Sequence, residues 1–172
     1  YYDVGSGRRV SRLFIPVLTF GASVGLPDDF RMTAEYARMK VSSASEGLSR
    51  WGAYLAVDKR IGNWKPYVYY ARMRSSGKAL DLYRAIESSS HNPALPPTLR
   101  NYQTFNADIV SAYDQSTIAL GTSYRLSPVS LLKAEYAHTS TGVVSSFVDA
   151  PTGSDSGNRR INVFSLSYNF TF

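Results

Sequence analysis

The chain has 172 residues, of which 44% are hydrophobic and 19% are charged, and its formal net charge is +6. This composition indicates neither a disordered chain nor a helical membrane protein, since no run of about 18 apolar residues occurs. Lysine and arginine are spread along the chain rather than gathered in a block, so no nucleic-acid partner is expected. Because cysteine is absent, a disulfide framework and a thiolate metal site are excluded.

Alternation of apolar and polar residues predicts seven strands along the chain. The first, from about Arg12 to Val24, is apolar on both faces, and Pro16 would remove one donor from its ladder. In the second, third, fifth and sixth strands an apolar row alternates with small or polar residues. These rows are Phe30, Met32, Ala34 and Tyr36; Trp51, Ala53, Leu55 and Val57; Ile118, Leu120, Thr122, Tyr124 and Leu126; and Leu132, Ala134 and Tyr136.

The fourth and seventh strands differ in how clearly their faces can be told apart. The fourth, from Lys65 to Arg74, divides into Tyr67, Tyr69, Ala71 and Met73 on one side and Tyr70, Arg72 and Arg74 on the other. Because two tyrosines, Tyr69 and Tyr70, are consecutive, the alternation does not show clearly which side is the apolar one. The seventh, within "NRRINVFSLSYNFTF", has the apolar row Phe164, Leu166, Tyr168, Phe170 and Phe172 against a row of serine, asparagine and threonine.

The connections between these strands alternate between short and long. "LPDD", "IGNW" and "LSP" are short, whereas "SSASEGL", residues 75–114 and "VVSSFVDAPTGSDSG" are longer. Such sorting is typical of a transmembrane β-barrel, which has short periplasmic turns and long outer loops. We therefore expect an all-β fold, a transmembrane antiparallel β-barrel, with residues 1–172 forming one barrel domain or the C-terminal part of one.

The number of predicted strands bears on whether the barrel is complete. An antiparallel barrel closed from one chain with both ends in the periplasm needs an even number of strands, and seven do not close. Either a further strand lies in the first ten residues, or the chain is the C-terminal part of a larger barrel. We favour the larger barrel.

Four stretches, "FRMTAEYARM", "WGAYLAVDKRIGNWKPYVYYARM", "TIALGTSYRLSPVSLLKAEYAH" and "INVFSLSYNFTF", resemble the last strands of Gram-negative outer-membrane porins. The resemblance covers about Phe30 to Phe172 and rests on the order and spacing of the stretches. It implies a barrel of roughly 14 to 18 strands in the outer membrane, in contact with membrane lipids, and a possible homotrimer. It also implies that Phe172, Phe170 and Tyr168 form the signal read by the barrel-assembly machinery.

If the apolar rows face lipid, the charged residues between them project into the lumen, because Arg or Lys at the lipid midplane costs roughly 2–4 kcal/mol. Rings of Arg and Lys favour anions. The expected function is passive diffusion of small hydrophilic solutes or ions, weakly anion-preferring or unselective. The predicted pore-lining residues are Arg31, Glu35, Asp58, Arg60, Tyr70, Arg72, Arg74, Arg125, Lys133 and Glu135. The alternative is that these charges pair across strands and only tile the wall.

No motif predicts catalysis. His91 and His138 have no partners at metal-ligand spacing, and no G-x-S-x-G elbow is present. We expect no catalytic residues, no metal and no cofactor.

Residues 75–114 form the longest connection, which we expect to be an extracellular or lumen-folded loop. Leu80, Tyr83, Ala85 and Ile86 fit one short amphipathic helical turn, which the prolines that follow would end. Two other functions remain open. One is a barrel that serves as an anchor, sleeve or adhesin for a partner protein, and the other is a soluble lipid or pigment carrier with the aromatic residues inside.

Overall fold

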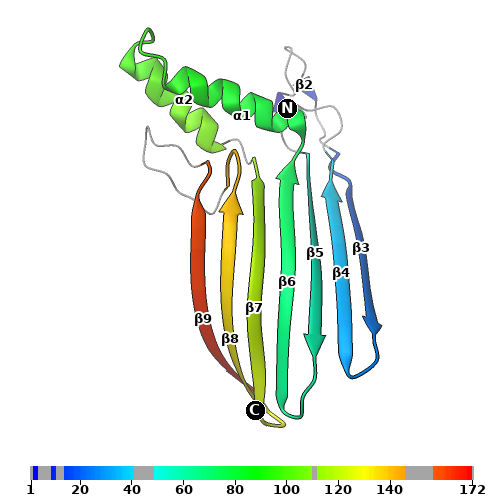
Figure 1. The fold of residues 1–172 in the computed structure, drawn as a ribbon. Coiled ribbons are helices and arrows are strands. Elements are labelled where there is room, and N and C mark those ends of the chain that lie inside the picture. Colours follow the sequence, from blue (N-terminus) through cyan, green and yellow to red (C-terminus); the bar gives the residue numbers. More distant parts are fainter. Residues whose placement is uncertain are drawn as a thin grey trace.

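The computed structural model of this chain describes residues 2–3, 9–10, 14–40, 49–109, 112–145 and 157–171. Its main feature is a seven-stranded antiparallel sheet whose strands follow one another in chain order (Figure 1). They are β3 (Val17–Gly25), β4 (Phe30–Met39), β5 (Arg50–Lys59), β6 (Trp64–Ser75), β7 (Asp114–Ser127), β8 (Ser130–Thr141) and β9 (Arg160–Phe170). The seven predicted strands are thus confirmed. Because β3 begins after Pro16, that proline removes no donor from the ladder.

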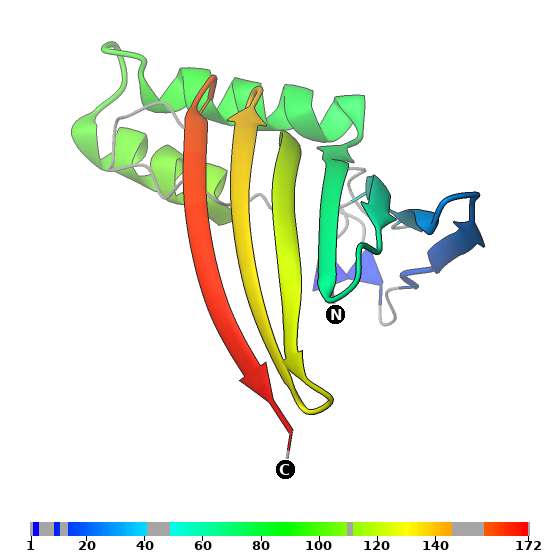
Figure 2. The ribbon, with the colours of Figure 1, turned by 60° about the horizontal axis from the view of Figure 1, so that its bottom comes forward.

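The sheet is open. Its edges are β3 and β9, which do not pair with each other. Of the first ten residues, the structure describes β1 (Tyr2–Asp3) and β2 (Arg9–Val10), which pair with one another and not with this sheet. Both the curvature and the separation of the two edges can be followed in Figure 2.

The three short connections lie together at one end of the sheet (Figure 1). Between β3 and β4, Asp28 and Asp29 adopt φ of 58° and 61°, a left-handed conformation that aspartate tolerates better than most residues. Between β5 and β6, Ile61 and Trp64 bond to each other around a two-residue turn in which Gly62 has φ of 59°. Turns of this kind match the twist of the strands that they join.

The strand ends that the long connections join lie at the opposite end of the sheet. The longest of these connections contains two helices rather than one helical turn. These are α1 (Gly77–Ser90) and α2 (Pro97–Ile109). Ser76 caps α1 by accepting a hydrogen bond from the Ala79 amide at 3.3 Å. Pro97 begins the second helix, because proline is well suited to a first turn, in which its missing N–H costs nothing. Of the two other long connections, residues 41–48 and 146–156 lie outside the described residues.

Helix α1 crosses the ends of β7, β8 and β9 in both views (Figures 1 and 2). It is held there by a small hydrophobic core in which Leu80 and Tyr83 pack with Ala112, just before β7, and Val144, just after β8. Among the described residues, no helix is both long and apolar enough to cross a membrane.

Candidate functional site

The pairing register divides the sheet into two unlike faces, because directly opposed residues of an antiparallel pair project to the same side. One row across all seven strands consists of Gly21, Glu35, Tyr54, Ala71, Thr117, Thr139 and Ile161. We call its side the polar face. A row on the other side, the apolar face, consists of Val24, Met32, Val57, Val68, Leu120, Tyr136 and Phe164.

The polar face is concave. A hollow of about 740 Å³ is lined by residues of six adjacent strands, from Glu35 on β4 to Val163 on β9, so the sheet curves around it. Its floor is made largely of small side chains, including Ala37, Gly52 and Ala71. Small residues on this face leave an open concave surface that is large enough to admit water or a small solute.

The apolar face is exposed. Most of its large side chains are exposed, from 37% of the surface of Met32 to 73% of that of Phe164, whereas others, such as Trp51 and Leu132, are half-buried. Exposed apolar side chains occur on every strand from Leu18 on β3 to Phe170 on β9. The apolar rows predicted for the second, third, fifth, sixth and seventh strands share this face, whereas the row predicted for the fourth strand lies on the polar face. A single exposed apolar residue is ordinary, whereas an apolar surface of this extent is unusual for a monomeric soluble protein. Phe172, the last residue of the predicted assembly signal, lies outside the described residues.

The predicted pore-lining residues divide between the two faces. Six of them share the polar face, namely Arg31, Glu35, Asp58, Arg125, Lys133 and Glu135. Arg60 lies in the short turn after β5. Tyr70, Arg72 and Arg74 were assigned to the wrong face, since the register places them beside Leu55, Ala53 and Trp51 on the apolar face.

The hairpin turn before β6 carries the signal that sequence reasoning missed. A two-residue turn pairing Ile61 with Trp64 also sets Asp58 opposite Tyr67, and therefore on the same face. The residues of β6 on the polar face are consequently Lys65, Tyr67, Tyr69, Ala71, Met73 and Ser75. None of them was among the predicted pore-lining residues.

Arg72 and Arg74 instead form a charged cluster at the end of the apolar face near the long connections. Asp114 on β7 lies 3.4 Å from Arg72 Nη2 and 3.8 Å from Arg74 Nε. The other carboxylate oxygen of Asp114 accepts a hydrogen bond from the Val143 amide at 3.3 Å. The two arginines are therefore paired with a carboxylate where they stand beside apolar neighbours.

A second cluster, on the polar face, joins three strands. Tyr67 on β6 donates a hydrogen bond to Glu135 Oε2 on β8 at 2.5 Å, and Lys133 Nζ lies 3.0 Å from the same oxygen. Tyr69 donates to the other oxygen of Glu135 at 3.4 Å. The strand between, β7, contributes Gly121, over which the Tyr67 ring lies. Tyr67 and Tyr69 thus hold the Glu135 carboxylate against the polar face.

The charges on the polar face are partly paired. Its strands carry five cations, Arg31, Arg50, Lys65, Arg125 and Lys133, and three anions, Glu35, Asp58 and Glu135. Lys65 on β6 lies 3.3 Å from Asp58 on β5, a pair across strands, whereas Lys133 and Glu135 pair within β8. Five cations minus three anions leave a net charge of two positive on this face.

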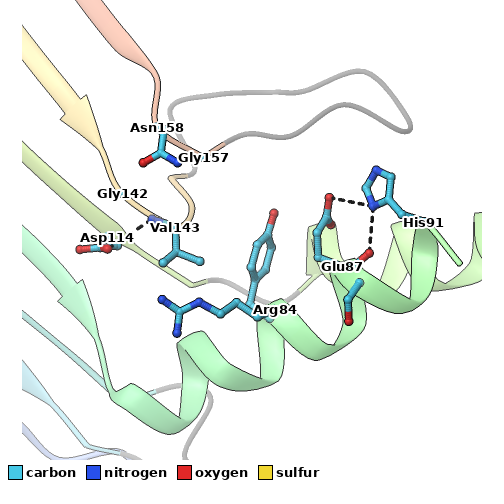
Figure 3. A pocket seen from close by; sticks show the side chains of 10 residues that line it. Arg84, Glu87, His91, Asp114, Gly142, Val143, Gly157 and Asn158 are labelled. Atoms are coloured by element: carbon cyan, nitrogen blue, oxygen red, sulfur yellow. Dashed lines mark hydrogen bonds and ion pairs between the residues drawn. The ribbon is translucent and has the colours of Figure 1, made fainter.

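A separate cavity of about 620 Å³ lies between α1 and the strand ends (Figure 3). Arg84, Glu87 and His91 reach toward it from the helix, opposite Asp114 and Asn158. Its charged groups have partners, since Glu87 lies 3.7 Å from His91 and Arg84 lies 3.0 Å from Asp81. The cavity therefore belongs to the interface between α1 and the strand ends.

The two histidines occupy different settings. His91 ends α1, whereas His138 lies on the apolar face and shares a hydrogen bond of 2.7 Å with Asn162. In the part of the chain that the structure describes, no three His, Asp or Glu side chains gather as metal ligands would.

Comparisons with known proteins add no relative to this description. No protein-family model, no curated protein and no solved structure matches the chain.

Proposed function

We propose that this chain forms part of the wall of an outer-membrane β-barrel that lets small hydrophilic solutes diffuse passively, with a weak preference for anions. The observation that carries the proposal is the contrast between the two faces of one curved sheet. The concave face is polar and hollow, and the outer face is a continuous apolar surface. A transmembrane barrel needs this arrangement, because lipid is outside and water inside. A soluble carrier needs the reverse.

On each strand the exposed apolar side chains of the apolar face occupy a limited stretch, and together these stretches form an apolar band across the sheet. The direction of this band relative to the strands supports the membrane assignment. On β3 the band runs from Leu18 to Val24 and is centred on residue 21; on β9 it runs from Phe164 to Phe170 and is centred on residue 167. Successive opposed pairs connect Gly21 on β3 with Ile161 on β9. The centre of the band on β9, residue 167, therefore lies 167 minus 161, or six, residues beyond the position opposite its centre on β3, a shift reached over six strand steps.

This slant corresponds to a strand tilt. A shift of one residue, about 3.3 Å, for each step of about 4.8 Å between strands means that the strands tilt by about 35° relative to the band. Transmembrane β-barrel strands tilt by about 35–45°. A flat layer of hydrocarbon explains why the apolar residues keep to one level while the strands cross it obliquely.

The charge of the polar face supports the selectivity. Arg31 and Arg125 form no ion pair within the described part of the chain, and both belong to the concave side. Excess Arg and Lys along a water-filled path raises the local concentration of anions. Two paired carboxylates reduce the excess of positive charge on the polar face, so the preference for anions is weak.

Several parts of this proposal rest on the resemblance to porins. They are the location in a Gram-negative outer membrane, the recognition of the last strand by the barrel-assembly machinery, the trimeric state and the closure of the barrel by strands outside this chain. Open edges at β3 and β9 are compatible with such closure, since unpaired strand edges do not persist in lipid.

The test is single-channel conductance of the full-length protein, purified from its native membrane and reconstituted in planar bilayers. We expect open steps that rise with salt concentration, and a reversal potential in a potassium chloride gradient that favours chloride. Folded protein that inserts but never conducts would contradict the proposal.

A second function, a sleeve or anchor for a partner protein, is favoured by the small side chains that line the 740 Å³ hollow. Such a surface accepts another polypeptide as readily as it accepts water. A silent but inserted protein that conducts after its partner has been removed with denaturant would support this second function.

A further inference from the structure

The polar face carries a small pocket at the end of the short turns, away from the large hollow. Its volume is about 100 Å³, and its lining includes Arg60, Asn63, Lys65, Ser123 and Arg125. The lining comes from two neighbouring hairpins, the turn between β5 and β6 and the end of β7. Three cations therefore converge on one pocket.

These cations are only partly neutralised. Lys65 pairs with Asp58 at 3.3 Å. Within the part of the chain that the structure describes, neither Arg60 nor Arg125 forms an ion pair. The pocket thus holds three positive charges and has one carboxylate beside it. Gathering like charges in this way is unfavourable without an anion between them.

The backbone around the pocket holds both arginines in place. The Arg125 amide donates to the Asn63 carbonyl at 2.9 Å, which ties β7 to the turn, and the Arg60 amide donates to the Asp29 carbonyl at 3.1 Å. Ile61 and Trp64 close the turn with bonds of 2.9 and 3.0 Å. A ligand would therefore meet cations whose backbone is already ordered, which lowers the entropic cost of binding.

We propose that this pocket binds the oxyanion group of a small solute, a phosphate or a carboxylate, at the short-turn mouth of the pore. The planar fork of a guanidinium suits both groups, because it can donate two parallel hydrogen bonds. The Ser123 hydroxyl and the Asn63 amide add neutral donors. The inference rests on the proposed pore and adds a defined anion-binding site to it.

Size limits what the pocket recognises. With about 100 Å³ against the 740 Å³ of the large hollow, and with three cations in its lining, the pocket suits a small charged group rather than the whole of an organic solute. The rest of an organic solute would extend into the lumen. The pocket therefore selects for an anionic group rather than for a whole molecule.

The first measurement is equilibrium binding of inorganic phosphate to the full-length protein folded in detergent, by titration calorimetry at low chloride. We expect saturable binding of one phosphate per chain. The double variant R60Q/R125Q should weaken it at least about tenfold, because two charge-assisted donors are lost. R31Q, which removes one positive charge from the same face outside the pocket, should change the dissociation constant less than about twofold.

R60K/R125K separates geometry from charge. It keeps both charges but loses the forks, so its affinity should lie between those of the wild type and R60Q/R125Q. An absence of phosphate binding to folded wild-type protein would overturn the site. So would an equal loss in R31Q, since that would indicate a diffuse field rather than a pocket.

A bilayer experiment keeps the site and the pore distinguishable. Phosphate added on the short-turn side should reduce the chloride current saturably in the wild type and not in R60Q/R125Q. A conducting channel that phosphate never reduces would overturn the site and leave the pore standing. Saturable calorimetric binding without any conductance would overturn the pore, and would support the pocket as an anion site on a silent barrel.

Discussion

Tyr67 and Glu135 form a hydrogen bond across an intervening strand. They belong to β6 and β8, and the Tyr67 phenol crosses Gly121 on β7 to donate to the carboxylate at 2.5 Å. All three residues lie in one register row of the polar face. The bond spans two strand spacings because the middle position has no side chain, so Gly121 and Tyr67 act as a unit.

Gly121→Ala should destabilise the protein. A Cβ there would clash with the Tyr67 phenol oxygen and lie 2.9 Å from the Ala134 carbonyl oxygen, so Tyr67 has to leave Glu135. We expect a loss of about 1–3 kcal/mol in the free energy of unfolding, measured by urea titration in detergent. Gly25→Ala, in the same register row, is the control, because nothing lies within 4 Å of a Cβ there. Equal effects of the two changes would show that the Tyr67 contact is irrelevant.

Leu120→Arg distinguishes lipid from water as the neighbour of the apolar face. Leu120 is 65% exposed in the middle of that face. In hydrocarbon the arginine should cost about 2–4 kcal/mol, measured as the free energy of folding into phosphatidylcholine vesicles. Leu126→Arg, near the short-turn end, should cost at most about 1 kcal/mol. If water covers this face, both changes should fall within about 0.5 kcal/mol of the wild type.

Arg31→Gln should shift the permeability ratio toward cations, whereas Arg74→Gln should leave it unchanged. Both variants lose one positive charge, but Arg31 belongs to the polar face, and Arg74 pairs with Asp114 on the apolar face. The reversal potential in a salt gradient measures the difference. A larger shift from Arg74→Gln would mean that β6 turns its arginines toward the solute path.

Leu80→Ala should release α1 from the sheet. Leu80 is 2% exposed and packs with Tyr83, Ala112 and Val144, so its truncation should cost about 2–5 kcal/mol of local stability. We expect amide hydrogens of α1 to exchange at least about thirtyfold faster, while those of β6 to β8 keep their protection. Leu82→Ala is the control, because Leu82 is 40% exposed on the same helix. Faster exchange in the strands as well would show that helix and sheet unfold together.

Much of the strand pattern could be predicted from local sequence. Alternation along β4, β5, β7, β8 and β9 places large apolar residues on one side, and turn chemistry at Asp28, Asp29 and Gly62 marks where the chain reverses. Both signals are local, because a period of two and a left-handed turn residue act over a few positions. Two helices in residues 75–114 were harder to predict, since their apolar stripes are short and Pro97, which begins α2, resembles a helix breaker.

Local sequence patterns were enough to predict the strands, their two unlike rows and the sorting of the connections by length. The row of β6 that shares a face with Glu135 could be assigned only from the folded sheet, and with it the meeting of Arg72 and Arg74 with Asp114 and of Lys65 and Arg125 around one pocket. Because β6 carries aromatic and basic residues on both sides, its own pattern has no preferred phase. Its orientation follows from hydrogen-bonded register with β5 and β7, and that register joins residues far apart in the chain.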